Sequence, residues 1–75
     1  MNKVLVTGAA GFIGSAVVKE CLEKDLEVFA IDVVENPYFR LPKHNNKLNY
    51  FQKNLKNIDE LEQIFLKKLF HFISL

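Results

Sequence analysis

The fold is decided by the stretch from Val4 to Gly14, which reads V-L-V-T-G-A-A-G-F-I-G. Apolar residues that favour β-structure run directly into glycines at positions 8, 11 and 14, and a helix-period pattern follows at once. This order is the context in which such glycines bind a dinucleotide pyrophosphate. Gly8 allows a sharp turn because glycine accepts a positive φ, and Gly11 lacks a Cβ, so backbone N–H groups can approach phosphate. Gly14 lets the helix pack close to the strand, and we predict a phosphate site at the positive end of the helix beginning near Phe12.

The spacing G-x-x-G-x-x-G, with Thr7 before it and Phe12-Ile13 inside it, resembles that of the extended short-chain dehydrogenase/reductases. Among them it is most similar to the NAD-dependent nucleotide-sugar epimerases and dehydratases. The resemblance implies an α/β fold, a partial Rossmann fold whose doubly wound parallel sheet runs β-α-β-β-α-β with strand order 3-2-1-4. Residues 1–75 are then expected to be the N-terminal part of an NAD-binding Rossmann domain, with the substrate domain absent. The alternative is a turn in another α/β fold, where the glycines serve packing only.

An acidic residue follows the second predicted strand, residues 27–31. Asp32 comes 18 residues after Gly14, close to the offset of about 20 expected for the acid that binds the adenosine ribose. Its carboxylate would accept hydrogen bonds from the ribose hydroxyls and would repel a 2′-phosphate. Neither Val33 nor Val34 supplies a cation, so NAD is favoured over NADP. The alternative role for Asp32 is to cap a loop or helix.

The third predicted strand, residues 48–52, leads to the dipeptide Asn54-Leu55. The family usually has Asp-Leu here in contact with the adenine, so an amide replaces the acid in this chain. The predicted cofactor-binding residues are Gly8, Gly11, Phe12, Ile13, Gly14, Asp32, Asn54 and Leu55. The basic connection 33–47 is interpreted as a solvated loop, and a contact to the cofactor or to a sugar nucleotide is its alternative role.

A first helix is predicted over residues 12–24. Its inner face is expected to carry Ile13, Ala16, Val17, Cys21 and Leu22. Cys21 is thereby interpreted as a core residue. Asp25 follows where family members usually have a glycine, and it suits a left-handed cap less well.

A second helix is predicted to extend to about residue 69. Asn57 and Glu60 have the spacing of a capping box. The apolar face of this helix is expected to consist of Ile58, Leu61, Phe65 and Leu69. Residues 70–75 are expected to begin a fourth strand.

The family's catalytic pair, Tyr-x-x-x-Lys, has no match in this chain. Tyr38 is followed four places later by Pro42, and Tyr50 by Asn54, so no catalytic residue is predicted. We expect NAD binding by the N-terminal piece of a nucleotide-sugar epimerase/dehydratase-like protein that is itself catalytically inactive. A nucleotide sugar would bind only if the missing C-terminal part were supplied. The alternative is a stand-alone NAD-binding or interaction module, with self-association through uncovered sheet edges.

The composition narrows the classes of partner. The chain has 75 residues, is 49% hydrophobic and 25% charged, and carries a formal net charge of +1. These values give no reason to expect nucleic acid or an acidic membrane as partner. A single cysteine excludes an internal disulfide, no apolar run is long enough to span a membrane, and the first strand leaves no room for a signal peptide, so a cytoplasmic location is expected. The scattered His44, His71 and Cys21 predict no metal site.

Overall fold

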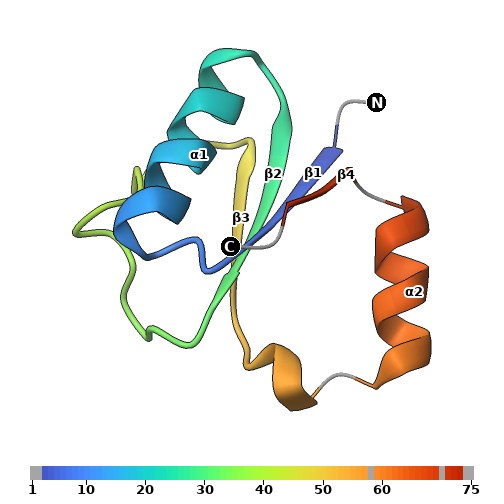
Figure 1. Cartoon of the computed structure of the whole chain (residues 1–75). Helices are drawn as coiled ribbons and strands as arrows, with labels where there is room; N and C mark the ends of the chain where they lie inside the picture. Colours follow the sequence, from blue (N-terminus) through green and yellow to red (C-terminus); the bar gives the residue numbers. More distant parts are fainter. Residues whose placement is uncertain (1–2, 58, 70, 74–75) are drawn as a thin grey trace.

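The fold is built around a parallel β-sheet (Figure 1). The computed structural model describes residues 3–57, 59–69 and 71–73. Its elements are, in chain order, β1 (Lys3–Thr7), α1 (Phe12–Glu23), β2 (Glu27–Asp32), β3 (Leu48–Gln52), the short 3₁₀ helix η1 (Leu55–Asn57), α2 (Glu60–Leu69) and β4 (His71–Ile73). Neighbouring strands are parallel and lie in the order β3-β2-β1-β4, which matches the expected order 3-2-1-4. The predicted α/β class is confirmed.

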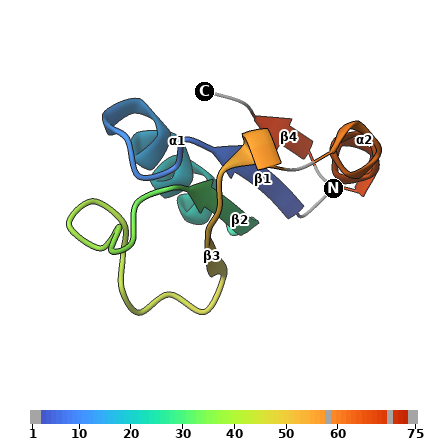
Figure 2. The ribbon, with the colours of Figure 1, turned by 90° about the horizontal axis from the view of Figure 1, so that it is seen from below.

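The two helices lie on opposite sides of the sheet, as Figure 2 shows. The core beneath α1 consists of Val4, Val6, Ala9, Val18, Cys21, Val28, Ala30 and Leu41. Because side chains alternate along a strand, the intervening residues Leu5 and Ile31 face the other side, where they are also buried. On that side Phe29 stacks on Phe51, with ring centroids 6.3 Å apart. Both faces of the sheet therefore carry apolar side chains, as expected for a parallel sheet.

The buried face of α1 differs from the predicted one. Its buried residues are Gly14, Ser15, Val18 and Cys21. Ile13 is 67% exposed and Ala16 is also exposed, so the prediction that these two side chains face the sheet is wrong. The reason is steric, because the first turn of α1 lies against the glycine turn and only small residues fit between them. Cys21 is confirmed as a core residue, and burial raises the pKa of its thiol.

The connection between β2 and β3 is more than a solvated loop. Pro37 and Leu41 are buried, and Leu41 belongs to the core beneath α1. The backbone N–H groups of Arg40 and Leu41 both donate to the Pro37 carbonyl, at 3.0 Å each. The loop is thus anchored in the middle of its length, which composition alone did not indicate.

The start of α2 also differs from the prediction. Asp59 Oδ1 accepts a hydrogen bond of 2.8 Å from the Glu62 N–H, so Asp59 caps a helix that begins at Glu60. The predicted capping pair of Asn57 and Glu60 is therefore wrong, because Asn57 ends η1 instead. Leu61, expected on the apolar face, is 79% exposed in the first turn of α2, whereas the helix contacts the sheet at β4. The other positions predicted for the apolar face of this helix lie outside the described residues or have undescribed side chains, and they are Ile58, Phe65 and Leu69. In the last predicted strand, residues 70, 74 and 75 lie outside the described residues.

Candidate functional site

The glycine turn between β1 and α1 is tied to the end of the neighbouring strand. Gly8 has φ 64°, the left-handed conformation that glycine adopts without strain. The Gly11 N–H donates to the Gly8 carbonyl at 3.1 Å, which closes the turn. The Ala9 N–H donates to the Ile31 carbonyl at 3.2 Å. The turn is therefore fixed against β2 by its own backbone.

Gly14 is required because α1 crosses the turn at this residue. A Cβ on Gly14 would lie 2.0 Å from the Gly8 carbonyl oxygen, far inside contact distance. The close approach is thus made to the turn and not to the strand that was predicted. A Cβ on Gly11 would lie 3.3 Å from the same oxygen, which is tight but not prohibitive.

The first turn of α1 presents backbone donors that nothing in the described chain uses. Gly11 is the N-cap and provides no side-chain cap, and the first turn has no acidic residue. The first intrahelical bond runs from the Ser15 N–H to the Gly11 carbonyl at 2.9 Å. Among the described residues, no acceptor faces the N–H groups of Phe12, Ile13 and Gly14. These amides and the helix dipole favour an anion at this end of α1.

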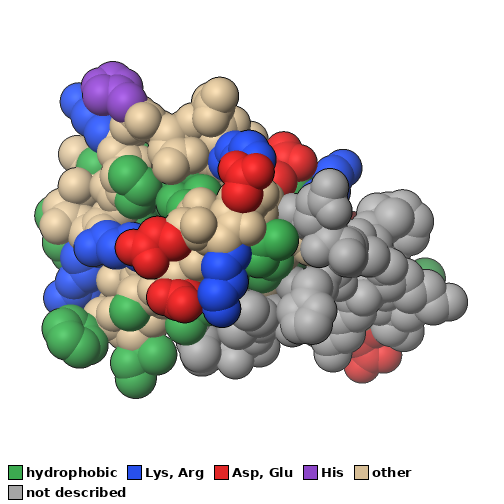
Figure 3. All heavy atoms as spheres, turned by 90° about the horizontal axis from the view of Figure 1, so that it is seen from above, with side chains coloured by type: hydrophobic (Ala, Val, Ile, Leu, Met, Phe, Trp, Pro, Cys, Tyr) green, Lys and Arg blue, Asp and Glu red, His purple; other side chains and the backbone are tan. Residues whose placement is uncertain are grey.

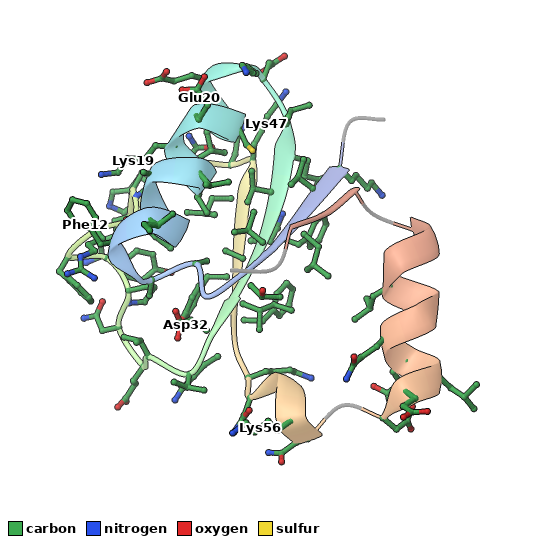
Figure 4. All side chains as sticks on the ribbon, viewed as in Figure 1. Phe12, Lys19, Glu20, Asp32, Lys47 and Lys56 are labelled. Carbon is green, nitrogen blue, oxygen red and sulfur yellow. The ribbon has the colours of Figure 1, made fainter. Side chains whose placement is uncertain are left out.

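Asp32 lies beside this turn, at the end of β2 (Figure 4). Its Oδ2 accepts a hydrogen bond of 2.9 Å from the Ala10 N–H. Its Oδ1 accepts one of 2.6 Å from the Val33 N–H. Two backbone donors therefore fix the direction of the carboxylate, and each oxygen keeps a lone pair for a further donor.

Tyr50 on β3 holds the segment that follows Asp32. The Tyr50 hydroxyl donates to the Val34 carbonyl and lies 3.4 Å from the Asp32 carbonyl oxygen. The Lys53 N–H also donates to the Asp32 carbonyl, at 2.9 Å. Burial, with smaller effects from Asp32 and Tyr38, raises the pKa of the Tyr50 phenol above its ordinary value. A raised pKa suits a structural hydroxyl and is the reverse of what a catalytic tyrosine needs.

Arg40 reaches the turn from the middle of the loop. Its Nη1 donates to the Ala10 carbonyl at 3.1 Å, although the two residues are 30 positions apart in sequence. The Arg40 guanidinium lies over the Phe39 ring, 5.0 Å from the centroid. The alternative role predicted for this basic loop was a contact to the cofactor or to a sugar nucleotide, and that contact stays a prediction. The contact of Arg40 with the turn was not predicted, because two residues 30 positions apart share no periodic signal.

Asn54 follows β3 at the same edge of the sheet. It is exposed, and its Oδ1 accepts a hydrogen bond of 3.0 Å from the Lys56 N–H, which starts η1. The Asn57 N–H donates to the Asn54 carbonyl at 3.0 Å. Leu55 is the first residue of η1, and its side chain is not described. The adenine contact predicted for this dipeptide stays a prediction.

A metal centre and a membrane-spanning helix are both absent from the part of the chain that the structure describes. No three His, Cys, Asp or Glu side chains there come close enough together to hold a metal ion. No described helix is both long enough and apolar enough to pass through a membrane.

Comparison with known proteins indicates the same family that the glycine spacing resembles. Residues 4–74 match the model of the NAD dependent epimerase/dehydratase family. UDP-glucose 4-epimerase of Pisum sativum is 33% identical over 87 residues that cover 99% of this chain and 25% of that protein. The dTDP-4-dehydro-6-deoxyglucose reductase of Escherichia coli is 33% identical over 67 residues, which cover 84% of this chain and 21% of the relative. The chain therefore spans about a quarter or less of the length of these curated relatives.

Solved structures with this fold include nucleotide-bound enzymes. A short chain dehydrogenase from Leptospira borgpetersenii with bound NAD+ superposes with a TM-score of 0.68 and 29% identity, over 88% of this chain and 25% of that chain. UDP-glucose 4-epimerase of Thermotoga maritima with UDP-glucose gives a TM-score of 0.67 and 28% identity, over 97% of this chain and 23% of that chain. Fold, glycine turn and family match agree, and the chain belongs to the NAD-dependent epimerase/dehydratase family.

Proposed function

We propose that this chain binds NAD at the glycine turn, as part of a nucleotide-sugar epimerase/dehydratase-like protein. The N–H groups of Phe12, Ile13 and Gly14 would hold the pyrophosphate, and Asp32 would accept hydrogen bonds from the hydroxyls of the adenosine ribose. Asn54 and Leu55 would contact the adenine. The observation that carries the proposal is the 2.9 Å hydrogen bond from the Ala10 N–H to Asp32 Oδ2, which holds the acid beside the turn.

The residues present fit such a cofactor. The amides at the start of α1 have no acceptor among the described residues, and no acidic side chain in the first turn opposes an anion. The Asp32 carboxylate is already oriented by two backbone donors, so binding a ribose would cost little side-chain ordering. NAD supplies a hydride acceptor when it is bound. The residues of this chain bind and orient the adenosine half.

We further propose that the chain by itself has no epimerase or dehydratase turnover. Tyr50 lies in β3 with its hydroxyl bonded to the Val34 carbonyl, and Tyr38 lies in the loop after β2. Neither tyrosine has a lysine four positions later to lower its pKa. Incubation of the chain with NAD and UDP-glucose should therefore give no change in the sugar, as measured by chromatography. Turnover would contradict this part of the proposal and leave NAD binding intact.

Calorimetry with NAD tests the site directly. Gly11→Val should abolish the heat of binding, because a branched side chain 3.3 Å or less from the Gly8 carbonyl would occupy the space at the turn. Gly11→Ala is the matched control and should retain part of the affinity. Circular dichroism must show the same helix and strand content for both variants. Equal affinity of the valine variant and the unmodified chain would place the site elsewhere.

Asp32→Ala tests the ribose contact. Loss of hydrogen bonds from two hydroxyls to a charged acceptor should weaken NAD binding by about 10–100-fold. AMP that lacks both ribose hydroxyls should bind the unmodified chain and the variant equally, because it cannot use the carboxylate. A loss of affinity for this analogue of the same size would mean that Asp32 acts only on the shape of the turn.

A further inference from the structure

One peptide group of the glycine turn, the one that joins Ala10 to Gly11, is hydrogen-bonded at both of its polar ends. Its carbonyl, on Ala10, accepts a hydrogen bond of 3.1 Å from Arg40 Nη1. Its N–H, on Gly11, donates to the Gly8 carbonyl at 3.1 Å and so closes the turn. The orientation of this peptide group therefore depends on the Arg40 side chain as well as on the turn itself.

This peptide group can rotate at little steric cost, because the residue that follows it is glycine. A half-turn of a peptide group changes ψ of the residue before it and φ of the residue after it. Gly11 has φ −73°, and the rotation would bring this angle into the positive range. Glycine accepts a positive φ about as readily as a negative one, whereas a residue with a Cβ does not. Steric hindrance therefore does not hold this peptide in place, and its hydrogen bonds must do so.

Rotation of this peptide would alter the start of α1. It would break the bond from the Gly11 N–H to the Gly8 carbonyl. Gly11 is also the N-cap of α1, and its own carbonyl accepts the first intrahelical bond, from the Ser15 N–H at 2.9 Å. The open amides of residues 12–14 follow directly in the chain. Their arrangement toward an anion therefore depends on the orientation of the same peptide group.

The loop between β2 and β3 places Arg40 at this carbonyl. The Arg40 N–H donates to the Pro37 carbonyl at 3.0 Å, and both Pro37 and Leu41 are buried. The guanidinium lies over the Phe39 ring, 5.0 Å from its centroid, which restricts the side chain further. Among the described residues Arg40 forms no ion pair, so no described carboxylate competes with the Ala10 carbonyl for its donors.

We propose that Arg40 is a positioning residue for the phosphate site, because it holds the peptide between Ala10 and Gly11 in the orientation that closes the turn. The inference rests on the proposed function and deepens it. Arg40 acts on the bound pyrophosphate through the backbone of the turn and not by contact with the ligand. The loop between β2 and β3 is thereby coupled to phosphate binding, although Arg40 and Ala10 are 30 positions apart in sequence.

A double-mutant cycle, with affinities measured by calorimetry, tests this role. Arg40→Gln should weaken NAD and ADP by about tenfold, the worth of one charge-assisted hydrogen bond, and adenosine, which has no phosphate, by less than about twofold. Gly11→Ala disfavours the rotated peptide through its Cβ, so in this background Arg40→Gln should cost less than about threefold. Lys43→Gln removes a charge from an exposed side chain of the same loop and should alter none of these affinities.

Backbone NMR gives a readout that a general loss of stability would not change. In Arg40→Gln, the Gly11 amide should show exchange between two peptide orientations by relaxation dispersion. This exchange should be absent from the unmodified chain and from the double variant with Gly11→Ala, in which the Cβ disfavours the second orientation.

Each other outcome overturns the inference. An equal loss from Arg40→Gln in both backgrounds would show that the guanidinium acts on the ligand directly, and an equal loss for adenosine would show that it supports the fold as a whole. If the unmodified chain bound NAD and Arg40→Gln changed neither the affinity nor the Gly11 exchange, the turn would hold its own peptide while the proposed function stood. If the unmodified chain did not bind NAD, the proposed function would fail, and with it the role of Arg40 in binding.

Discussion

The two ends of α1 differ in how their backbone hydrogen-bonding groups are paired. Every helix leaves N–H groups at one end and carbonyls at the other without intrahelical partners. At the carboxyl end the chain supplies the partners itself, because the N–H groups of Asp25 and Leu26 donate to the carbonyls of Leu22 and Cys21, at 3.0 and 3.1 Å. At the amino end, the described chain supplies no acceptor for the corresponding amides. The carboxyl end is therefore closed by the chain's own backbone, and the amino end is where we propose that NAD binds.

The charged side chains near the two ends of α1 also differ in whether they form ion pairs. Toward the carboxyl end, Lys47 Nζ lies 2.6 Å from Asp25 Oδ1 and Lys24 Nζ lies 3.4 Å from Glu20 Oε1. Figure 3 views the molecule from this end and shows acidic and basic side chains next to each other. Figure 4 places Asp32 near the other end of the helix, far along the ribbon from Glu20 and Lys47. There Arg40 contacts a backbone carbonyl and forms no ion pair among the described residues.

The largest change in stability is expected from a substitution at the amino end of α1. Gly14→Ala should destabilise the fold by more than about 3 kcal/mol, because the new Cβ would lie 2.0 Å from the Gly8 carbonyl oxygen and the backbone must move. Elsewhere in a helix the same change is favourable by about 1 kcal/mol. Urea unfolding followed by circular dichroism measures the difference. The reciprocal control is Ala16→Gly on the exposed face of α1, which should cost only about 1 kcal/mol. Similar losses for the two variants would show that helix propensity, and not the turn contact, limits this residue.

A smaller effect is expected where Tyr50 supports the segment after Asp32. Tyr50→Phe removes the hydroxyl that donates to the Val34 carbonyl and should cost about 1 kcal/mol. The raised pKa of this phenol adds a pH dependence. Stability from a raised folded-state pKa is complete below the unfolded value near 10 and is lost as the pH rises above it.

The unmodified chain should therefore lose stability between pH 9 and 11 faster than Tyr50→Phe, as measured by thermal unfolding at each pH. Absorbance titration at 295 nm should show that the raised phenol pKa of Tyr50 is absent from the variant. Parallel stability curves for the two proteins would mean that the Tyr50 hydroxyl has the same environment in the folded and unfolded chains.

What the sequence predicts well are features set by neighbours along the chain. The apolar run before Gly8 and the glycine spacing were sufficient for β1 and the turn, because both depend on local backbone geometry. The offset of Asp32 was sufficient for the position of the acid, because the βαβ unit has a characteristic length and pairs Thr7 with Ile31. The errors arise where packing between segments decides. Ile13 has the spacing of a core residue, yet the close contact of Gly14 with the turn rotates it outward. The Arg40 contact with Ala10 joins residues whose proximity no periodic pattern encodes.

The smallest effect is expected at the carboxyl end, where Asp25 takes the place of the family's usual glycine. Its φ is 63°, a conformation that costs a residue with a side chain about 1 kcal/mol or more. Asp25→Gly removes this strain and also the contact with Lys47. Because the Asp25 side chain is 85% exposed, that ion pair is worth only a few tenths of a kcal/mol.

Relief of the backbone strain outweighs loss of the ion pair, so Asp25→Gly should stabilise the chain by about 0.5 kcal/mol in urea unfolding. Asp25→Ala keeps the strain and loses the ion pair, so it should destabilise the chain. NAD affinity should be unchanged in both variants, since this end of α1 is closed by its own backbone. A lower stability of the glycine variant would mean that the Lys47 contact holds the loop before β3 more firmly than its exposure implies. A changed NAD affinity would mean that the two ends of the helix are coupled.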